Sequence, residues 1–149
     1  MRMAGARRNR AKLYLCVTLL IMAFIFVQSA LPANVSTKES DPIVDIVQEP
    51  LKLERKPAVF LVRSSAHFME YLALGASLFL TVRAVRKSGK AGFWIPWLIG
   101  AAYAITDELH QHFVPGRSCE LHDMVIDACG VAAGVAVCWM IQRRRQAKE

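Results

Sequence analysis

Acidic and histidine side chains gather in three short stretches of an otherwise apolar sequence. These stretches are His67–Glu70, Asp107-Glu108-Leu109-His110-Gln111, and His122-Asp123 with Asp127. Carboxylates and imidazoles serve as general acids and bases, and they also bind divalent cations. Because ionisable groups are costly in hydrocarbon, their presence in apolar segments predicts a functional site.

The apolar residues form long runs that indicate a membrane protein. They make up 54% of the 149 residues. Crossing a hydrocarbon core of roughly 30 Å takes about 20 helical residues. Four runs reach this length, at residues 13–31, 60–82, 93–113 and 121–141. The sequence therefore predicts one all-α domain over residues 1–149, an integral membrane bundle of four transmembrane helices.

The first run and the segment after it have their own expected roles. The apolar part of a signal peptide spans about 7 to 15 residues, and the first run is longer, so we expect a retained span. Residues 32–59 are rich in Pro, Ser and charged side chains, which predicts an outer loop. Within it, the spacing of Ile43, Ile46 and Val47 indicates a surface helix.

Charge distribution predicts the orientation of the bundle. Most of the 19 basic residues precede the first run, separate the second from the third, or follow the fourth. Cytoplasmic flanks carry such an excess of Lys and Arg, so we expect both termini in the cytoplasm and the acids and histidines on the outer side. The basic clusters adjoin apolar runs and lack a recognition motif, which favours contact with membrane lipids and excludes nucleic acid.

Helical spacing predicts that the ionisable residues converge. Three sets each lie on one helix face, with spacings of three, four or seven residues: His67, Glu70 and Tyr71; Asp107, His110 and Gln111; Asp123, Asp127, Gly130 and Gly134. Counting the helical rise places His67, Asp107 and Asp127 roughly 10 Å below the outer surface. The small residues of the third set allow close helix packing. We therefore expect one outer cavity.

Carboxylates in such a cavity need compensation. They could pair with Arg63, Arg117 or a histidine, share a proton, or bind a divalent cation. Carboxylate ligation suits Mg²⁺ or Mn²⁺ and added histidine suits Zn²⁺, so the identity of a metal stays open. The Pro115-Gly116 turn would hold Arg117 over the cluster.

Together these motifs resemble the VanZ-like family. The resemblance rests on Arg63 to Tyr71 with Leu74-Gly75, on Asp107 to Arg117, on Asp123 and Asp127 with Gly130 and Gly134, and on Gln28-Ser29 followed by Ser36 and Ser40. It covers essentially the whole chain and implies a small multi-pass protein of the bacterial cell membrane. The family is named for a member linked to glycopeptide (teicoplanin) resistance, which does not make resistance the task of this chain. Ser64 stands where many relatives have Lys.

The leading hypothesis is an enzyme acting on a lipid-linked or cell-envelope substrate at the outer leaflet. Its predicted catalytic residues are His67, Glu70, Asp107, Glu108 and Asp127. Its predicted substrate-binding residues are Arg63, Tyr71, His110, Gln111, Arg117 and Asp123. Three alternatives stay open: a non-enzymatic binding or accessory protein, a small transporter that would need to form an oligomer, and acids that only lock the helices together.

Overall fold

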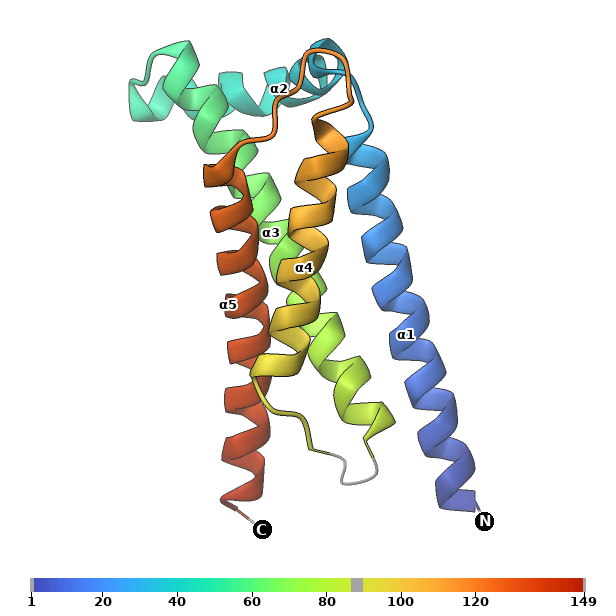
Figure 1. Cartoon of the computed structure of the whole chain (residues 1–149). Coiled ribbons are helices and arrows are strands. Elements are labelled where there is room, and N and C mark those ends of the chain that lie inside the picture. Colours follow the sequence, from blue (N-terminus) through green and yellow to red (C-terminus); the bar gives the residue numbers. More distant parts are fainter. Residues whose placement is uncertain (1, 87–89, 149) are drawn as a thin grey trace.

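The computed structural model describes residues 2–86 and 90–148, which form five helices and no strand. The helices are α1 (Arg2–Ser29), α2 (Ala33–Leu51), α3 (Arg55–Val85), α4 (Trp94–Gln111) and α5 (Leu121–Gln146). Four of them run along the length of the molecule, and α2 lies across one end (Figure 1). We call this end the α2 end. The start of α1 and the end of α5 lie at the opposite, terminal end (Figure 1).

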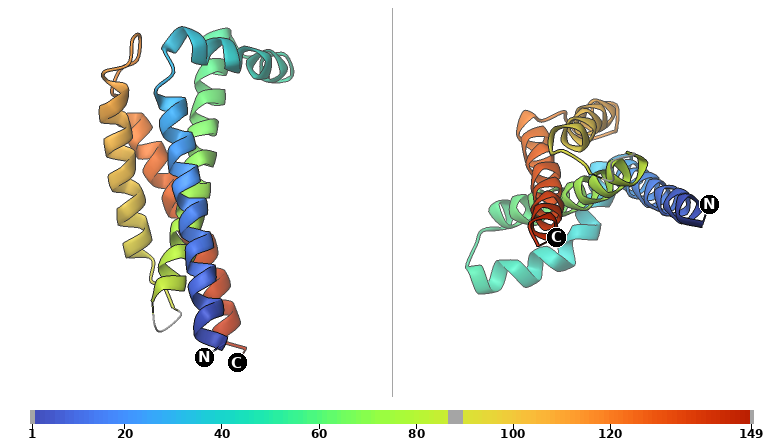
Figure 2. Two further views of the ribbon diagram at one scale, coloured as in Figure 1. Left: turned by 90° about the vertical axis from the view of Figure 1, so that its right-hand side faces the viewer. Right: turned by 90° about the horizontal axis from the view of Figure 1, so that it is seen from below.

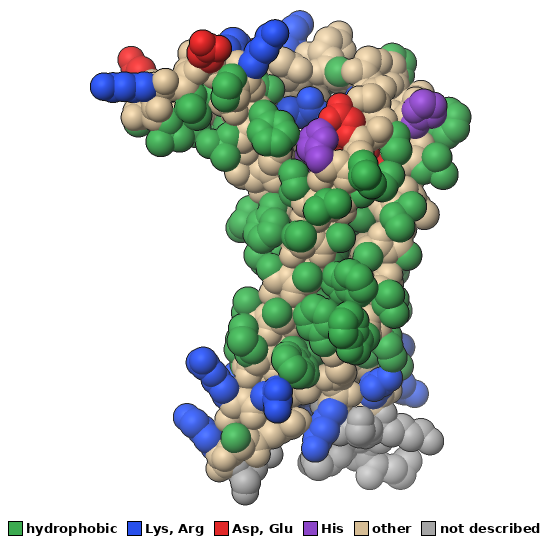
Figure 3. Space-filling view, turned by 60° about the vertical axis from the view of Figure 1, so that its left-hand side comes forward, with side chains coloured by type: hydrophobic (Ala, Val, Ile, Leu, Met, Phe, Trp, Pro, Cys, Tyr) green, Lys and Arg blue, Asp and Glu red, His purple; other side chains and the backbone are tan. Residues whose placement is uncertain are grey.

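The described residues contain three helices that are long and apolar enough to cross a membrane. By length and composition they are Arg7–Ser29, Arg55–Val85 and Leu121–Gln146. On the face shown in Figure 3, hydrophobic side chains cover the middle of the molecule, while charged side chains gather towards its ends. This arrangement is that of a multi-pass helical membrane protein.

The predicted third span corresponds to α4, which is not one of these three helices. It has 18 residues, and its last turns carry Asp107, Glu108, His110 and Gln111. These polar side chains lower its mean hydropathy. α4 nevertheless lies lengthwise beside α5 (Figures 1 and 2), and the two helices pack together.

The most extensive packing joins α3 to α5, along the glycines that the sequence singled out. A Cβ atom on Gly130 would come within 2.6 Å of the Phe68 carbonyl oxygen, and one on Gly134 would overlap the Leu72 carbonyl. Only glycine therefore permits this close approach of the two backbones. We call this contact of Gly130 and Gly134 with α3 the glycine seam. It fixes how α3 and α5 are rotated towards each other, and so which of their side chains meet at the α2 end.

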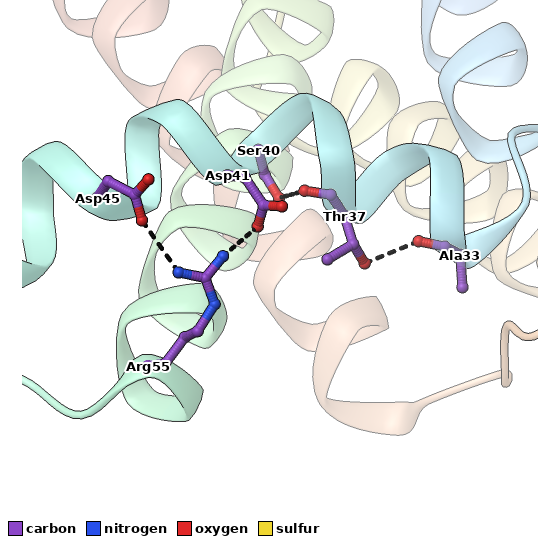
Figure 4. Close-up of polar contacts among 6 residues, drawn as sticks. All are labelled: Ala33, Thr37, Ser40, Asp41, Asp45 and Arg55. Atoms are coloured by element: carbon purple, nitrogen blue, oxygen red, sulfur yellow. Dashed lines mark hydrogen bonds and ion pairs between the residues drawn. The ribbon is translucent and has the colours of Figure 1, made fainter.

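The predicted outer loop contains the whole of α2, a surface helix longer than Ile43 to Val47. Its Val44 is fully buried against Ala58 and Val62 of α3. Arg55, at the start of α3, reaches back to α2, with Nη1 3.0 Å from Asp45 Oδ1 and Nη2 2.6 Å from Asp41 Oδ1 (Figure 4). α2 also contains Pro42 and Pro50 within its helical span.

Polar contacts attach the other helices to this core. Thr18 of α1 and Thr81 of α3 have hydroxyl oxygens 3.0 Å apart, and the Tyr103 hydroxyl donates to the Met22 carbonyl at 2.7 Å. Gln142 of α5 bonds both main-chain groups of Ala91, which precedes α4. The elements that carry the ionisable residues are thus fixed at both ends of the molecule.

Candidate functional site

A cavity of about 180 Å³ lies at the α2 end. Its polar lining comes from α1, α2, α3, α4 and the loop before α5: Gln28, Ser29, Ser36, Ser40, Arg63, His67, Glu70, Asp107 and Arg117. Ile25, Ile43 and Val62 add apolar surface. Five of the eleven predicted site residues therefore share one cavity, with two cations, two acids and one histidine.

Asp107 is the most firmly positioned acid of the cavity. Its side chain is buried, and its Oδ2 accepts hydrogen bonds from the Tyr71 hydroxyl at 3.2 Å and from Gln111 Nε2 at 3.3 Å. Oδ1 has no hydrogen-bond partner among the described residues. Tyr71 and Gln111 are thus predicted site residues that hold Asp107 rather than line the cavity.

Arg117 joins the loop before α5 to the end of α1. Nε donates to the Leu31 carbonyl at 3.0 Å, Nη2 to the Gln28 carbonyl at 3.2 Å, and Nη1 to Gln111 Oε1 at 3.1 Å. Burial lowers the pKa of this guanidinium from its ordinary value, and the charge of nearby Arg63 lowers it further. A guanidinium still remains protonated at neutral pH, so Arg117 places a fixed positive charge at the cavity.

His67 on α3 faces Asp127 on α5. Their Nδ1 and Oδ1 atoms are 3.4 Å apart, but the alignment does not make a hydrogen bond, and both Asp127 oxygens lack a hydrogen-bond partner in the described part of the chain. Asp127 is fully buried. It lies one turn before Gly130, so the glycine seam brings this carboxylate against α3.

Glu108 is buried beside the start of α5. Its Oε2 accepts a hydrogen bond from the main-chain N–H of Glu120 at 3.0 Å, and its Oε1 has no partner among the described residues. Glu120 is the N-cap of α5. A carboxylate beside the N-terminus of α5 is stabilised by the positive end of the helix dipole. Glu108 therefore has a structural role, independent of any catalytic role.

A second, wider cleft of about 600 Å³ opens between the starts of α3 and α5. It shares Arg63 and His67 with the cavity and is also lined by Asp123. His122 lies between Glu120 and Asp123, with ring nitrogens 3.2 and 3.0 Å from their carboxylates. These three side chains are close enough to share a metal ion, although each is partly or fully exposed.

The predicted binding residue His110 points towards α1. Its ring centroid is 4.4 Å from that of Phe26, and its Nδ1 is 3.4 Å from the Ser29 hydroxyl. Three residues along a helix make a rotation of about 300°, which leaves His110 to one side of Asp107. It therefore contacts Ser29, which lines the cavity, and is not itself among the lining residues.

Four polar cavity residues lie outside the predicted site: Gln28, Ser29, Ser36 and Ser40. They come from the end of α1 and from α2. Their arrangement in sequence contributed to the family resemblance, and that pattern was the signal available for them. Spacing within the ionisable stretches could not reveal them.

These observations define a class: a multi-pass helical membrane protein with buried carboxylates, a histidine and two arginines at one end of its bundle. The sequence profile of the VanZ/LLP1 family matches residues 14–142, so the chain belongs to this family. The resemblance to VanZ-like proteins is thereby confirmed. Searches of curated proteins and of solved structures return no similar protein.

Proposed function

We propose that this protein is an enzyme that acts on a lipid-linked cell-envelope substrate at the outer leaflet of a bacterial cell membrane. The observation that carries the proposal is the cavity at the α2 end, where His67, Glu70 and Asp107 meet Arg63 and Arg117. Acid–base catalysis needs a proton acceptor and a proton donor beside the reacting group. The cavity supplies both types of group, with cations at its wall.

The pairing of His67 with Asp127 supports an acid–base role. Nδ1 of the ring faces the buried carboxylate, so Nε2 is the nitrogen that would exchange a proton with a substrate. A carboxylate behind an imidazole orients the ring and stabilises its protonated form. Glu70 lies one turn along α3 and would be the second acid–base group.

The remaining cavity surface supports the substrate class. Arg63 and Arg117 suit an anionic group such as a phosphate, because a guanidinium donates in a planar, bidentate geometry. Ile25, Ile43 and Val62 offer apolar contact to the adjoining part of a lipid. A headgroup in the cavity with its chain in the bilayer would satisfy both surfaces.

The proposal includes the topology expected from sequence. α4 would be the third of four spans, with both termini in the cytoplasm and the α2 end facing outwards. Its support is the charge bias together with the lengthwise packing of α4, whose apolar residues before Asp107 would lie within the bilayer.

A non-enzymatic binding or accessory function is the second candidate. The observation that favours it is the structural engagement of two predicted catalytic acids: Asp107 accepts bonds from Tyr71 and Gln111, and Glu108 accepts one from the start of α5. A protein that only captures or masks an envelope ligand would use the same arginines without proton transfer.

Expression in a glycopeptide-susceptible Gram-positive host tests both candidates. The wild type is compared with Glu70→Gln/Asp107→Asn and with the matched control Asp41→Asn/Asp45→Asn, which removes the same charge from the surface of α2. Membrane levels are equalised, and both drug susceptibility and envelope-lipid mass spectra are measured. A chelator arm tests for a divalent cation.

An enzyme should alter at least one lipid-linked species in the wild type and the control, and the cavity variant should abolish that change. A binding protein should instead give an effect that scales with its amount, without a new lipid species. Identical lipid profiles in all strains would contradict the enzymatic proposal. Protection against a glycopeptide that survives the cavity variant would separate resistance from the cavity acids.

A further inference from the structure

Another polar cavity, of about 330 Å³, lies at the terminal end, away from the acids of the α2 end. Its lining combines four arginines from three helices with Tyr14, Leu80 and Ala84: the arginines are Arg7 and Arg10 of α1, Arg83 of α3 and Arg145 of α5. α1 and α5 each pack on α3, so the cavity lies where the ends of the three helices converge. Figure 3 shows Lys and Arg side chains gathered at this end of the molecule.

Hydrogen bonds hold α1 in place at this cavity. Arg7 Nε donates to the Ala84 carbonyl at 3.2 Å, and Nη2 lies 3.5 Å from the Val85 carbonyl. These carbonyls belong to the last turn of α3, whose acceptors have no partner within the helix. The negative end of the α3 dipole therefore stabilises Arg7, and the cavity has a defined wall rather than only loose surface side chains.

The charged side chains that line this cavity are all arginines. No carboxylate is among the described residues that line it. Of the 12 acidic residues in the sequence, 11 lie at residues 39–127, and Glu149 lies outside the described residues. Guanidinium groups that share a cavity repel one another, and a bound anion would convert this repulsion into attraction. Guanidinium forks and a phenolic hydroxyl are the donors that match phosphate oxygens.

We propose that this cavity binds a phosphate group, with Arg10 and Arg145 as its exposed clamp and Arg83 and Tyr14 at its wall. The phosphate could belong to an anionic lipid headgroup or to a free phosphate ion. Leu80 and Ala84 continue into the apolar middle of the bundle, which suits the glycerol and chain of a lipid. The site is independent of the cavity at the α2 end and of the proposed function.

Native mass spectrometry of the full chain in detergent tests the proposal. The probes are phosphatidylglycerol, phosphatidylcholine as the neutral reference, and inorganic phosphate in a separate arm. Arg10→Gln/Arg145→Gln is compared with Arg8→Gln/Arg144→Gln, which removes the same charge from neighbouring positions outside the cavity lining. Arg145→Gln alone is a milder variant, and thermal unfolding checks that each protein is folded.

We expect the wild type and the control to retain phosphatidylglycerol in preference to phosphatidylcholine. The cavity variant should lower that retention by about tenfold, because it removes two guanidinium groups that would donate directly to the phosphate, whereas the control removes only nearby charge. If inorganic phosphate binds, loses affinity in the cavity variant and the lipid does not bind, the site binds phosphate and its ligand is a free phosphate ion. Equal binding by the cavity variant, the milder variant and the control, for both probes, would overturn the proposal.

Discussion

Arg117→Lys should destabilise the fold strongly although it preserves the charge. The guanidinium makes three hydrogen bonds, to Gln28 of α1, to Leu31 just after α1 and to Gln111 of α4. A lysine ammonium is a single point donor and can replace about one of them. Hydrogen bonds to a charged group contribute about 1.5–3 kcal/mol each, so losing two, partly offset by water, should lower the free energy of unfolding by about 2–4 kcal/mol.

The matched control is Arg55→Lys, which also removes a forked arginine. Arg55 bridges Asp41 and Asp45, but its side chain is 52% exposed. Exposed ion pairs contribute little to stability, so this variant should leave the free energy of unfolding nearly unchanged. Equilibrium unfolding of both purified proteins in one detergent is the assay. Equal losses, or a loss below about 0.5 kcal/mol for Arg117→Lys, would refute the view that these three contacts fasten the loop before α5 to α1.

Two further predictions concern the seam and the topology. Gly134→Ala should lower the free energy of unfolding by about 1–2 kcal/mol, because backbone overlap outweighs the better helix propensity of alanine. Gly5→Ala is the control: nothing lies within 4 Å of its added methyl group, so it should leave stability unchanged or raise it. A Gly134→Ala protein as stable as this control would contradict the close packing of α3 against α5 at Gly134. In proteins that keep one cysteine each, a membrane-impermeant maleimide on intact cells should label Cys119 and should not label a cysteine introduced by Lys148→Cys. The reverse pattern would contradict the proposed four-span topology, either in its orientation or in the crossing by α4, and labelling of both positions would contradict the crossing by α5.

Much of the helical layout follows from hydrophobic run length alone. The predicted span 121–141 and α5 begin at the same residue, and the run 60–82 lies within α3. The helices continue past the apolar runs because the flanking Arg, Lys and Ala residues also favour helix, and run length does not report this. Hydropathy alone does not identify α4 as a span, because its acids lower its mean hydropathy. Tertiary packing nevertheless keeps α4 within the bundle.

The candidate site was predictable in residue type more than in contact. Spacing placed His67 and Asp107 at similar depth, and both line the cavity. Spacing could not give the rotation of α4 relative to α1, which turns His110 towards Phe26. Nor could it show that Glu108 would meet the start of α5, because that contact depends on the path of the intervening loop. The catalytic and binding roles remain predictions.

We expect the two prolines of α2 to limit how deeply the molecule can sit in a bilayer. Proline has no N–H, so the carbonyls four residues earlier, on Lys38 and Ile46, have no main-chain donor at the usual helical position. Such groups require water or lipid headgroups, because hydrocarbon cannot satisfy them. α2 lies across its end of the bundle (Figure 2), and so it would act as a stop against deeper immersion. The height of this stop would keep Arg63 and Glu70 within reach of water and headgroups, while the glycine seam below remains in hydrocarbon.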